Sequence, residues 1–127
     1  MKMHSYFTAI PDNVKLMHWL PQNDLLGHRK TKLFITHCGN NGLHEAMYHG
    51  VPIIGFPFFG DQVYNRFLVE SHGFGIGMDI TSFTTAQLVQ NIRKMLTNGT
   101  YSETMRRMSA ILHDQPMSGS DTVCHWI

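Results

Sequence analysis

Three short polar segments contain residue types that suit a ligand carrying phosphate and sugar hydroxyls. They are Trp19-Leu20-Pro21-Gln22, the stretch from His37 to Gly42, and Phe59-Gly60-Asp61-Gln62. Between them they offer a flat aromatic face, side-chain and backbone N–H donors, and carboxylate and amide acceptors. These groups are the ones that would have to meet if the chain binds such a ligand.

The middle segment has the composition of a strand-to-helix turn that binds phosphate. Gly39 and Gly42 allow the backbone to approach a ligand closely, and the free N–H groups and dipole of a helix N-terminus favour negative charge. His37 and Asn41 add side-chain donors. Glu45 lies one turn beyond Asn41 on the same helix face, where its carboxylate could accept hydrogen bonds from ribose hydroxyls. Turns of this composition are common, so the segment alone does not establish a phosphate site.

The two outer segments offer complementary groups, each with a simpler structural explanation. Trp19 presents a face on which a base could stack, although most tryptophans pack in protein cores. Asp61 and Gln62 place acceptors and donors side by side, which suits adjacent hydroxyls of a sugar. Asp61 could instead serve only as the N-cap of the helix that follows it. Taken singly, these residues leave both interpretations open.

Residue spacing argues against a metal site and against a redox cysteine pair. His44-Glu45 and His49 resemble the HExxH zinc signature, but the second histidine comes one residue late and points away on a helix. We therefore expect no metal. Cys38 and Cys124 lie far apart and form no CxxC motif. We expect two free thiols, while a disulfide between them stays open.

Alternating strands and helices must position the three segments. Short apolar runs predict strands over residues 13–19, 32–37, 52–56 and 75–80. The first predicted helix is a short turn from Pro21 to Leu26, and two more are predicted over 41–49 and from 61 to about 73. A fourth follows Thr84 and has Leu88, Ile92, Met95 and Leu96 on one face. The last has an apolar stripe of Met105, Met108, Ile111 and Leu112. Gly50 is expected to end the second helix, and Thr84 with Gln87 to form a capping box.

This order of elements predicts an α/β fold with a parallel sheet. Ligands of such sheets bind beyond the carboxyl ends of the strands. All three polar segments follow a predicted strand, so we expect them to meet at one edge of the sheet.

Size and composition limit the chain to one globular domain. A length of 127 residues can bury a single core, and 43% hydrophobic with 15% charged residues excludes a disordered chain. The formal net charge of +1 and the scattered Lys and Arg exclude the basic stripe of a nucleic-acid interface. The first residues lack the apolar core of a signal peptide, and the richest apolar run, 51–60, is too short to span a bilayer. The chain is predicted to be soluble and without a targeting segment.

Taken together and in order, the motifs resemble the UDP-glucuronosyltransferase/UDP-glycosyltransferase family. The blocks that carry the resemblance are Trp19–His28, Phe34–His37, Asn41-Gly42, Glu45-Ala46, Tyr48–Pro52 and Asp61-Gln62. The signature covers roughly Trp19 to Asn65, and the likeness continues to His113-Asp114-Gln115-Pro116, which looks like the stretch before the membrane anchor of animal members. Ordered blocks of this length are highly specific.

The resemblance implies a Rossmann-like parallel sheet with flanking helices, forming the C-terminal half of a GT-B glycosyltransferase. Residues 1–127 would be the UDP-sugar donor-binding domain, with the N-terminal acceptor domain and the C-terminal membrane anchor absent. The resemblance implies that Trp19 stacks on uracil with Gln22 nearby, and that Glu45 binds the ribose. It implies that the diphosphate is held by His37, Asn41 and the backbone at Gly39 and Gly42. It also implies that the transferred sugar is bound by Asp61 and Gln62. Arg29 stands where animal members usually have proline. Cys38 stands where animal members usually have glycine, and plant members often have cysteine at this position.

The family reaction is an inverting transfer of a glucuronosyl or glucosyl group from a UDP-sugar to a hydroxyl of a small lipophilic acceptor. It needs no metal or cofactor besides the UDP-sugar co-substrate. The family base, a histidine oriented by an aspartate, belongs to the N-terminal domain, so we expect no catalytic residue in this chain and no turnover by it alone. Full-length animal members are endoplasmic-reticulum membrane proteins, and pairing with identical or related chains stays open. The alternative function is a truncated, non-catalytic fragment that binds nucleotide or pairs with a full-length partner.

Overall fold

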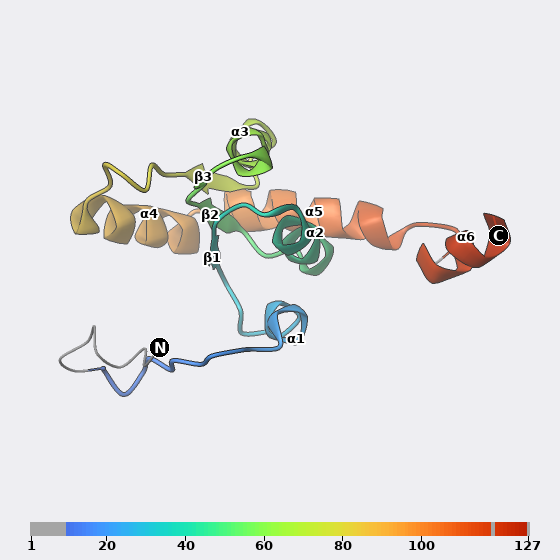
Figure 1. The fold of residues 1–127 in the computed structure, drawn as a ribbon, viewed down its shortest axis with the longest axis horizontal. Helices are drawn as coiled ribbons and strands as arrows, with labels where there is room; N and C mark the ends of the chain where they lie inside the picture. The colour runs from blue at the N-terminus through green and yellow to red at the C-terminus, as the bar shows by residue number, and fades with distance from the viewer. Residues whose placement is uncertain (1–9, 118, 127) are drawn as a thin grey trace.

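The computed structural model describes residues 10–117 and 119–126, and a small parallel sheet lies at its centre (Figure 1). The strands β1 (Phe34–Thr36), β2 (Ile53–Gly55) and β3 (Gly75–Gly77) pair in the order β1-β2-β3. Phe34 pairs with Ile53, and Ile53 pairs with Gly75, both in parallel. The predicted parallel α/β arrangement is therefore confirmed, with strands shorter than the sequence pattern suggested.

Helices follow and flank these strands. In the described part of the chain they are α1 (Gln22–Leu26), α2 (Asn40–His49), α3 (Asp61–Ser71), α4 (Thr85–Thr97), α5 (Gly99–His113) and α6 (Gly119–Trp126). Figure 1 shows α6 at the far end of the molecule from the N-terminal segment, and none of its residues is buried. Helix α6 is not among the helices predicted from the sequence.

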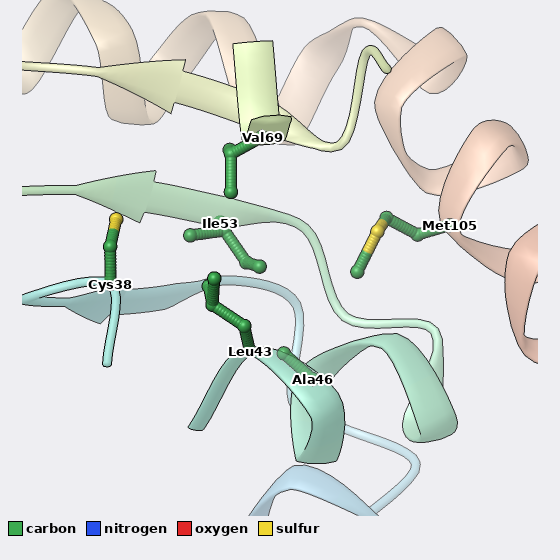
Figure 2. Packing of buried hydrophobic residues seen from close by; sticks show 6 residues of the cluster. All are labelled: Cys38, Leu43, Ala46, Ile53, Val69 and Met105. Atoms are coloured by element: carbon green, nitrogen blue, oxygen red, sulfur yellow. The ribbon is translucent and has the colours of Figure 1, made fainter. Parts of the chain in front are cut away.

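The core has two parts because successive residues of β2 point to opposite faces of the sheet. Ile53 packs on one face with Cys38, Leu43, Ala46, Val69 and Met105, which come from the turn before α2 and from α2, α3 and α5 (Figure 2). Ile54 packs on the other face with Phe56, Met78 and Met95 of α4. The central strand is thus buried on both sides, as expected for a parallel sheet.

Local capping signals fix several helix ends. Gly50 adopts the left-handed conformation at φ 69° and ends α2 as predicted. The capping box of Thr84 and Gln87 is present at the start of α4. Asn98 ends α4, and its side chain accepts a hydrogen bond from the Thr100 N–H at the start of α5.

The N-cap predicted for α3 is wrong. Gly60, at φ 64°, occupies the N-cap position, and Asp61 is the first helical residue. The Asp61 carboxylate accepts a hydrogen bond from Asn65 one turn later instead of from the helix backbone. Asp61 is therefore not needed to satisfy the helix N-terminus.

The strand predicted over residues 13–19 is also wrong. This segment runs below the sheet without pairing to β1, β2 or β3, and Val14, Met17 and Trp19 are exposed (Figure 1). Its alternating pattern would need a neighbouring strand to satisfy its backbone N–H and C=O groups. Two predicted stripe residues, Leu96 and Ile111, are likewise exposed.

The strand predicted over residues 75–80 ends early. β3 stops at Gly77, and the Asp79 carboxylate accepts hydrogen bonds from the N–H and hydroxyl of Thr81. These bonds turn the chain away from the sheet and lower the pKa of Asp79. A local side-chain turn thus replaces the last residues of the predicted strand.

Candidate functional site

The three polar segments meet beyond the carboxyl ends of β1 and β2. One cavity of about 460 Å³ is lined by Gln22, Thr36, His37, Gly39, Asn40, Asn41, Gly42, Asp61 and Gln62. A second, of about 590 Å³, is lined by Trp19, Leu20, Pro21, Gln22, Asn23, Asp24 and Glu45. Gln22 lines both, so the cavities adjoin. We call them the inner and outer donor cavities.

The turn between β1 and α2 forms one wall of the inner donor cavity. Cys38 adopts a left-handed conformation at φ 67°, which is unusual for a residue with a side chain. Gly39 is the N-cap of α2, and no side chain caps this helix end. A Cβ atom at position 39 would lie 2.4 Å from Nε2 of His37. Glycine at this position therefore makes room for the His37 ring beside the open N-terminus of α2.

A hydrogen bond connects the two donor cavities. Gln22 Nε2 donates to Glu45 Oε2 over 2.8 Å, which ties the start of α1 to α2. Trp19, with 78% of its surface exposed, lines the outer cavity together with Glu45. The structure therefore places an aromatic face and an oriented carboxylate in one cavity, although Trp19 does not follow a strand as predicted.

Asn65 is a site residue that was not among those predicted from the sequence. Its side chain is only 8% exposed, and its Nδ2 donates to the Cys38 carbonyl oxygen over 3.0 Å and to Asp61 Oδ2 over 2.9 Å. One amide thus joins the strained turn before α2 to the carboxylate at the start of α3. The spacing of four residues between Asp61 and Asn65 on a predicted helix was the signal that could have found it.

Gln62 contributes less to the inner cavity than the sequence suggested. Its side chain is 7% exposed, and its Oε1 accepts hydrogen bonds from the N–H groups of Phe58 and Phe59 over 2.9 and 3.3 Å. The amide oxygen is therefore committed to the loop before α3. The amide nitrogen is the group left for a ligand.

Cys38 is held as an unreactive thiol. It is fully buried against Gly55, and a Cβ atom at position 55 would lie 2.2 Å from its Sγ. Burial raises the pKa of the Cys38 thiol from 9.0 to about 11, against a smaller opposing effect of the Arg66 charge. Since the thiolate is the nucleophilic form, Cys38 serves packing. Both Cys38 and Cys124 are free thiols, as expected.

The histidines of the near-HExxH motif are used separately. His44 Nδ1 lies 2.9 Å from the Asn40 carbonyl oxygen, whereas His49 Nε2 lies 2.8 Å from Asn23 Oδ1. Within residues 10–117 and 119–126, no group of three metal-ligating side chains comes together. The helices over the same residues lack the length and apolar character needed to cross a membrane.

Comparison with known proteins adds a family to this geometry. Residues 7–127 match the family model described as "UDP-glucoronosyl and UDP-glucosyl transferase". The chain is 46% identical over 115 residues to UDP-glucuronosyltransferase 2C1 of Oryctolagus cuniculus, which covers 91% of this chain and 23% of that protein. It is 45% identical over 115 residues to UDP-glucuronosyltransferase 2A3 of Homo sapiens, covering 91% of this chain and 22% of that protein. The chain thus spans less than a quarter of the length of these relatives.

Two solved structures share the fold. The glycotransferase of kitacinnamycin superposes with a TM-score of 0.82 at 24% identity, over 94% of this chain and 31% of that one. The spinosyn forosaminyltransferase SpnP superposes with a TM-score of 0.79 at 22% identity, over 87% of this chain and 29% of that one. These likenesses confirm the predicted Rossmann-like C-terminal half of a GT-B fold.

Proposed function

This chain belongs to the UDP-glucuronosyl and UDP-glucosyl transferase family, and on that basis we propose that its two donor cavities together bind a UDP-sugar. The observation that carries the proposal is Gln22, which lines both cavities and is bonded to Glu45 at their junction. A nucleotide-sugar is an extended ligand with an aromatic base at one end and hydroxyls at the other. Two adjoining cavities of different chemistry suit such a ligand.

The diphosphate is assigned to the inner cavity. The N-terminus of α2 has no side-chain cap, so its first N–H groups and its dipole are available to an anion. His37 and Asn41 line the same cavity and add side-chain donors. As UDP leaves, negative charge grows on the diphosphate, and donors fixed in place before the reaction stabilise that charge.

The uridine is assigned to the outer cavity. The exposed Trp19 offers a stacking face for uracil. Glu45 is oriented by its hydrogen bond from Gln22, which leaves its second carboxylate oxygen to accept from the ribose hydroxyls. This division places the ribose at the junction, where the base and the diphosphate must be connected.

The transferred sugar is assigned to Asp61 and Gln62. Asn65 holds one oxygen of the Asp61 carboxylate, and the other is free to accept from a sugar hydroxyl. Gln62 would donate through its amide nitrogen, because its oxygen binds the backbone of Phe58 and Phe59. Phe58 and Phe59 are themselves exposed, which supports a lipophilic acceptor approaching from this side.

In the proposed reaction, the acceptor hydroxyl oxygen attacks the anomeric carbon as the bond from that carbon to the diphosphate oxygen breaks. The configuration inverts, the acceptor loses its proton to a base, and UDP leaves. His37 lies beside the helix N-terminus in the diphosphate position, so it is assigned to the leaving group and not to the base. No metal or further cofactor takes part in this scheme.

We therefore propose that this chain alone binds the donor without transferring the sugar. The chain spans about 23% of the length of UDP-glucuronosyltransferase 2C1. The base would come from a part of the family protein outside the matched segment. Sustained glycoside formation from UDP-glucuronic acid or UDP-glucose and a phenol by the purified chain would contradict this proposal. Binding without turnover would favour the non-catalytic alternative for the chain as it stands.

Calorimetric titration with UDP and with a UDP-sugar tests the assignment. Trp19→Ala and His37→Ala should each weaken UDP binding roughly tenfold, since a stacked base or a charge-assisted hydrogen bond contributes about 1–3 kcal/mol. Asp61→Ala should weaken the UDP-sugar but leave UDP unchanged, because UDP carries no sugar at that position. Circular dichroism should show all variants folded. A folded wild-type chain that does not bind UDP would refute the proposal.

A further inference from the structure

A third cavity lies at the end of the sheet opposite the inner donor cavity. It has a volume of about 340 Å³ and is lined by residues that precede β1 and β2, including Lys32 and Pro52, and by Arg106 of α5. The inner donor cavity follows the carboxyl ends of the same strands. The outer donor cavity lies nearer, since its Asn23 Oδ1 is 2.8 Å from Nε2 of His49, which lines the third cavity. Neither Arg29, Lys32 nor Arg106 lines a donor cavity, so this site is separate from the proposed function.

The lining of this basic cavity has one sign of charge. Arg29, Lys32 and Arg106 line it together with His28 and His49, and no carboxylate is among the lining residues. Over residues 10–117 and 119–126 the ion pair present is Arg66–Glu70, on α3. Arg29, Lys32 and Arg106 therefore line the cavity without a carboxylate partner from the described residues. Lys32 Nζ donates to the Arg29 carbonyl oxygen over 3.5 Å, which holds the ammonium beside Arg29.

The C-terminus of α2 is the opposing charge at this cavity. His49 and Gly50 line it, and a helix C-terminus carries the equivalent of about half a negative charge. Its exposed carbonyls are partly satisfied elsewhere, because the Tyr48 carbonyl oxygen accepts from Ser109 and lies 3.1 Å from His113 Nε2. Half a negative charge does not balance three cations. The cations exceed what the helix end requires.

We propose that the basic cavity binds a small phosphorylated anion through Arg29, Lys32 and Arg106. Guanidinium and ammonium groups are the side chains that bind phosphate oxygens most strongly. Arg106 Nε donates to the Ser102 carbonyl, which holds the side chain in place and leaves its terminal nitrogens for the ligand. The cavity volume is at the lower end for ligand sites, so it suits a phosphate or diphosphate group rather than a whole nucleotide.

Titration of the 127-residue chain with inorganic pyrophosphate tests this site. In a ¹⁵N-labelled sample, pyrophosphate should shift the amides near Arg29, Lys32 and Arg106. By calorimetry, Arg29→Gln and Arg106→Gln should each raise Kd roughly tenfold, the loss expected for one charge-assisted hydrogen bond. Arg107→Gln is the matched control, since it removes the same charge from the next residue of α5, which does not line the cavity.

Three outcomes would overturn the proposal. The first is a folded wild-type chain that does not bind pyrophosphate. The second is an equal loss in Arg107→Gln and Arg106→Gln, which would mean non-specific attraction. The third is loss of binding in His37→Ala with none in Arg29→Gln, which would place pyrophosphate in the inner donor cavity. Arg29 is exposed in a loop, so its variant keeps the test decisive if Arg106→Gln fails to fold.

A vesicle arm identifies the source of the phosphate. The chain would be sedimented with phosphatidylcholine vesicles with and without phosphatidic acid. If vesicle binding requires phosphatidic acid and is inhibited by pyrophosphate, the result supports the site with a lipid headgroup as its ligand. Pyrophosphate binding without vesicle binding supports the site with a soluble phosphorylated ligand.

Discussion

Replacing Asn65 with alanine tests how the two halves of the inner donor cavity are held together. Asn65 Nδ2 donates to the buried Cys38 carbonyl oxygen and to Asp61 Oδ2. In Asn65→Ala the Cys38 carbonyl loses its side-chain donor in a buried position. The turn around Cys38, already in a left-handed conformation, would lose the contact that ties it to α3.

The cost can be divided between the two bonds. An unsatisfied buried carbonyl costs about 1–3 kcal/mol, whereas water can replace the lost donor at the exposed Asp61 carboxylate, so that bond contributes about 0.5–1 kcal/mol. We expect Asn65→Ala to lower the free energy of unfolding by about 1.5–4 kcal/mol in total. Against a typical stability of about 5–15 kcal/mol, this loss is large but leaves the chain measurable.

Urea unfolding of a double-mutant cycle is the assay. Asp61→Ala alone should cost little, and Asn65→Ala in the Asp61→Ala background should keep most of its cost, because that cost comes from the Cys38 carbonyl. UDP binding should weaken in Asn65→Ala, since the turn that carries His37 and Gly39 is loosened. A cost below about 0.5 kcal/mol, the usual range for an unimportant surface site, would refute the reasoning. So would a cost that vanishes when Asp61 is absent.

Two further predictions concern the packing around Cys38. Because burial raises the pKa of its thiol to about 11, the folded chain keeps a proton that the unfolded chain loses near pH 9. The free energy of unfolding should therefore fall as pH rises from 9 to 11. Urea titrations across this range should show a smaller fall in the Cys38→Ala variant than in the wild-type chain. An identical fall in both would contradict the assigned burial of Cys38. Gly55→Ala should destabilise by about 1–3 kcal/mol through overpacking, since its Cβ would lie 2.2 Å from Cys38 Sγ. Thermal unfolding should show that adding Cys38→Ala restores part of this loss; no recovery would place the clash elsewhere.

Local features were predictable because their physical cause lies within a few residues of sequence. Gly50 ends α2 because glycine adopts a left-handed conformation without strain. Thr84 and Gln87 form their capping box because both donors and both acceptors lie within one helical turn. The ordered motifs that resemble the family are also a property of the sequence alone, and the family model matches residues 7–127.

The tertiary structure decided which distant groups share an environment. The alternating pattern of residues 13–19 could not show that no described strand lies beside them. Likewise, the composition around Asp61 and Gln62 could not show that Asp61 would accept a hydrogen bond from Asn65. Nor could it show that Gln62 would accept one from the loop backbone.

The basic cavity is the clearest case of this difference. Arg29 and Lys32 precede β1, while Arg106 lies more than seventy residues later on α5. They line one cavity because α5 packs against α2, with Ser109 and His113 contacting the Tyr48 carbonyl. The sequence by itself determined α1 to α5, most strands and the family, because hydrogen bonding and hydrophobic spacing act locally. Only the packing of helices on the sheet decided the two sites, because each joins side chains that no local interaction brings together.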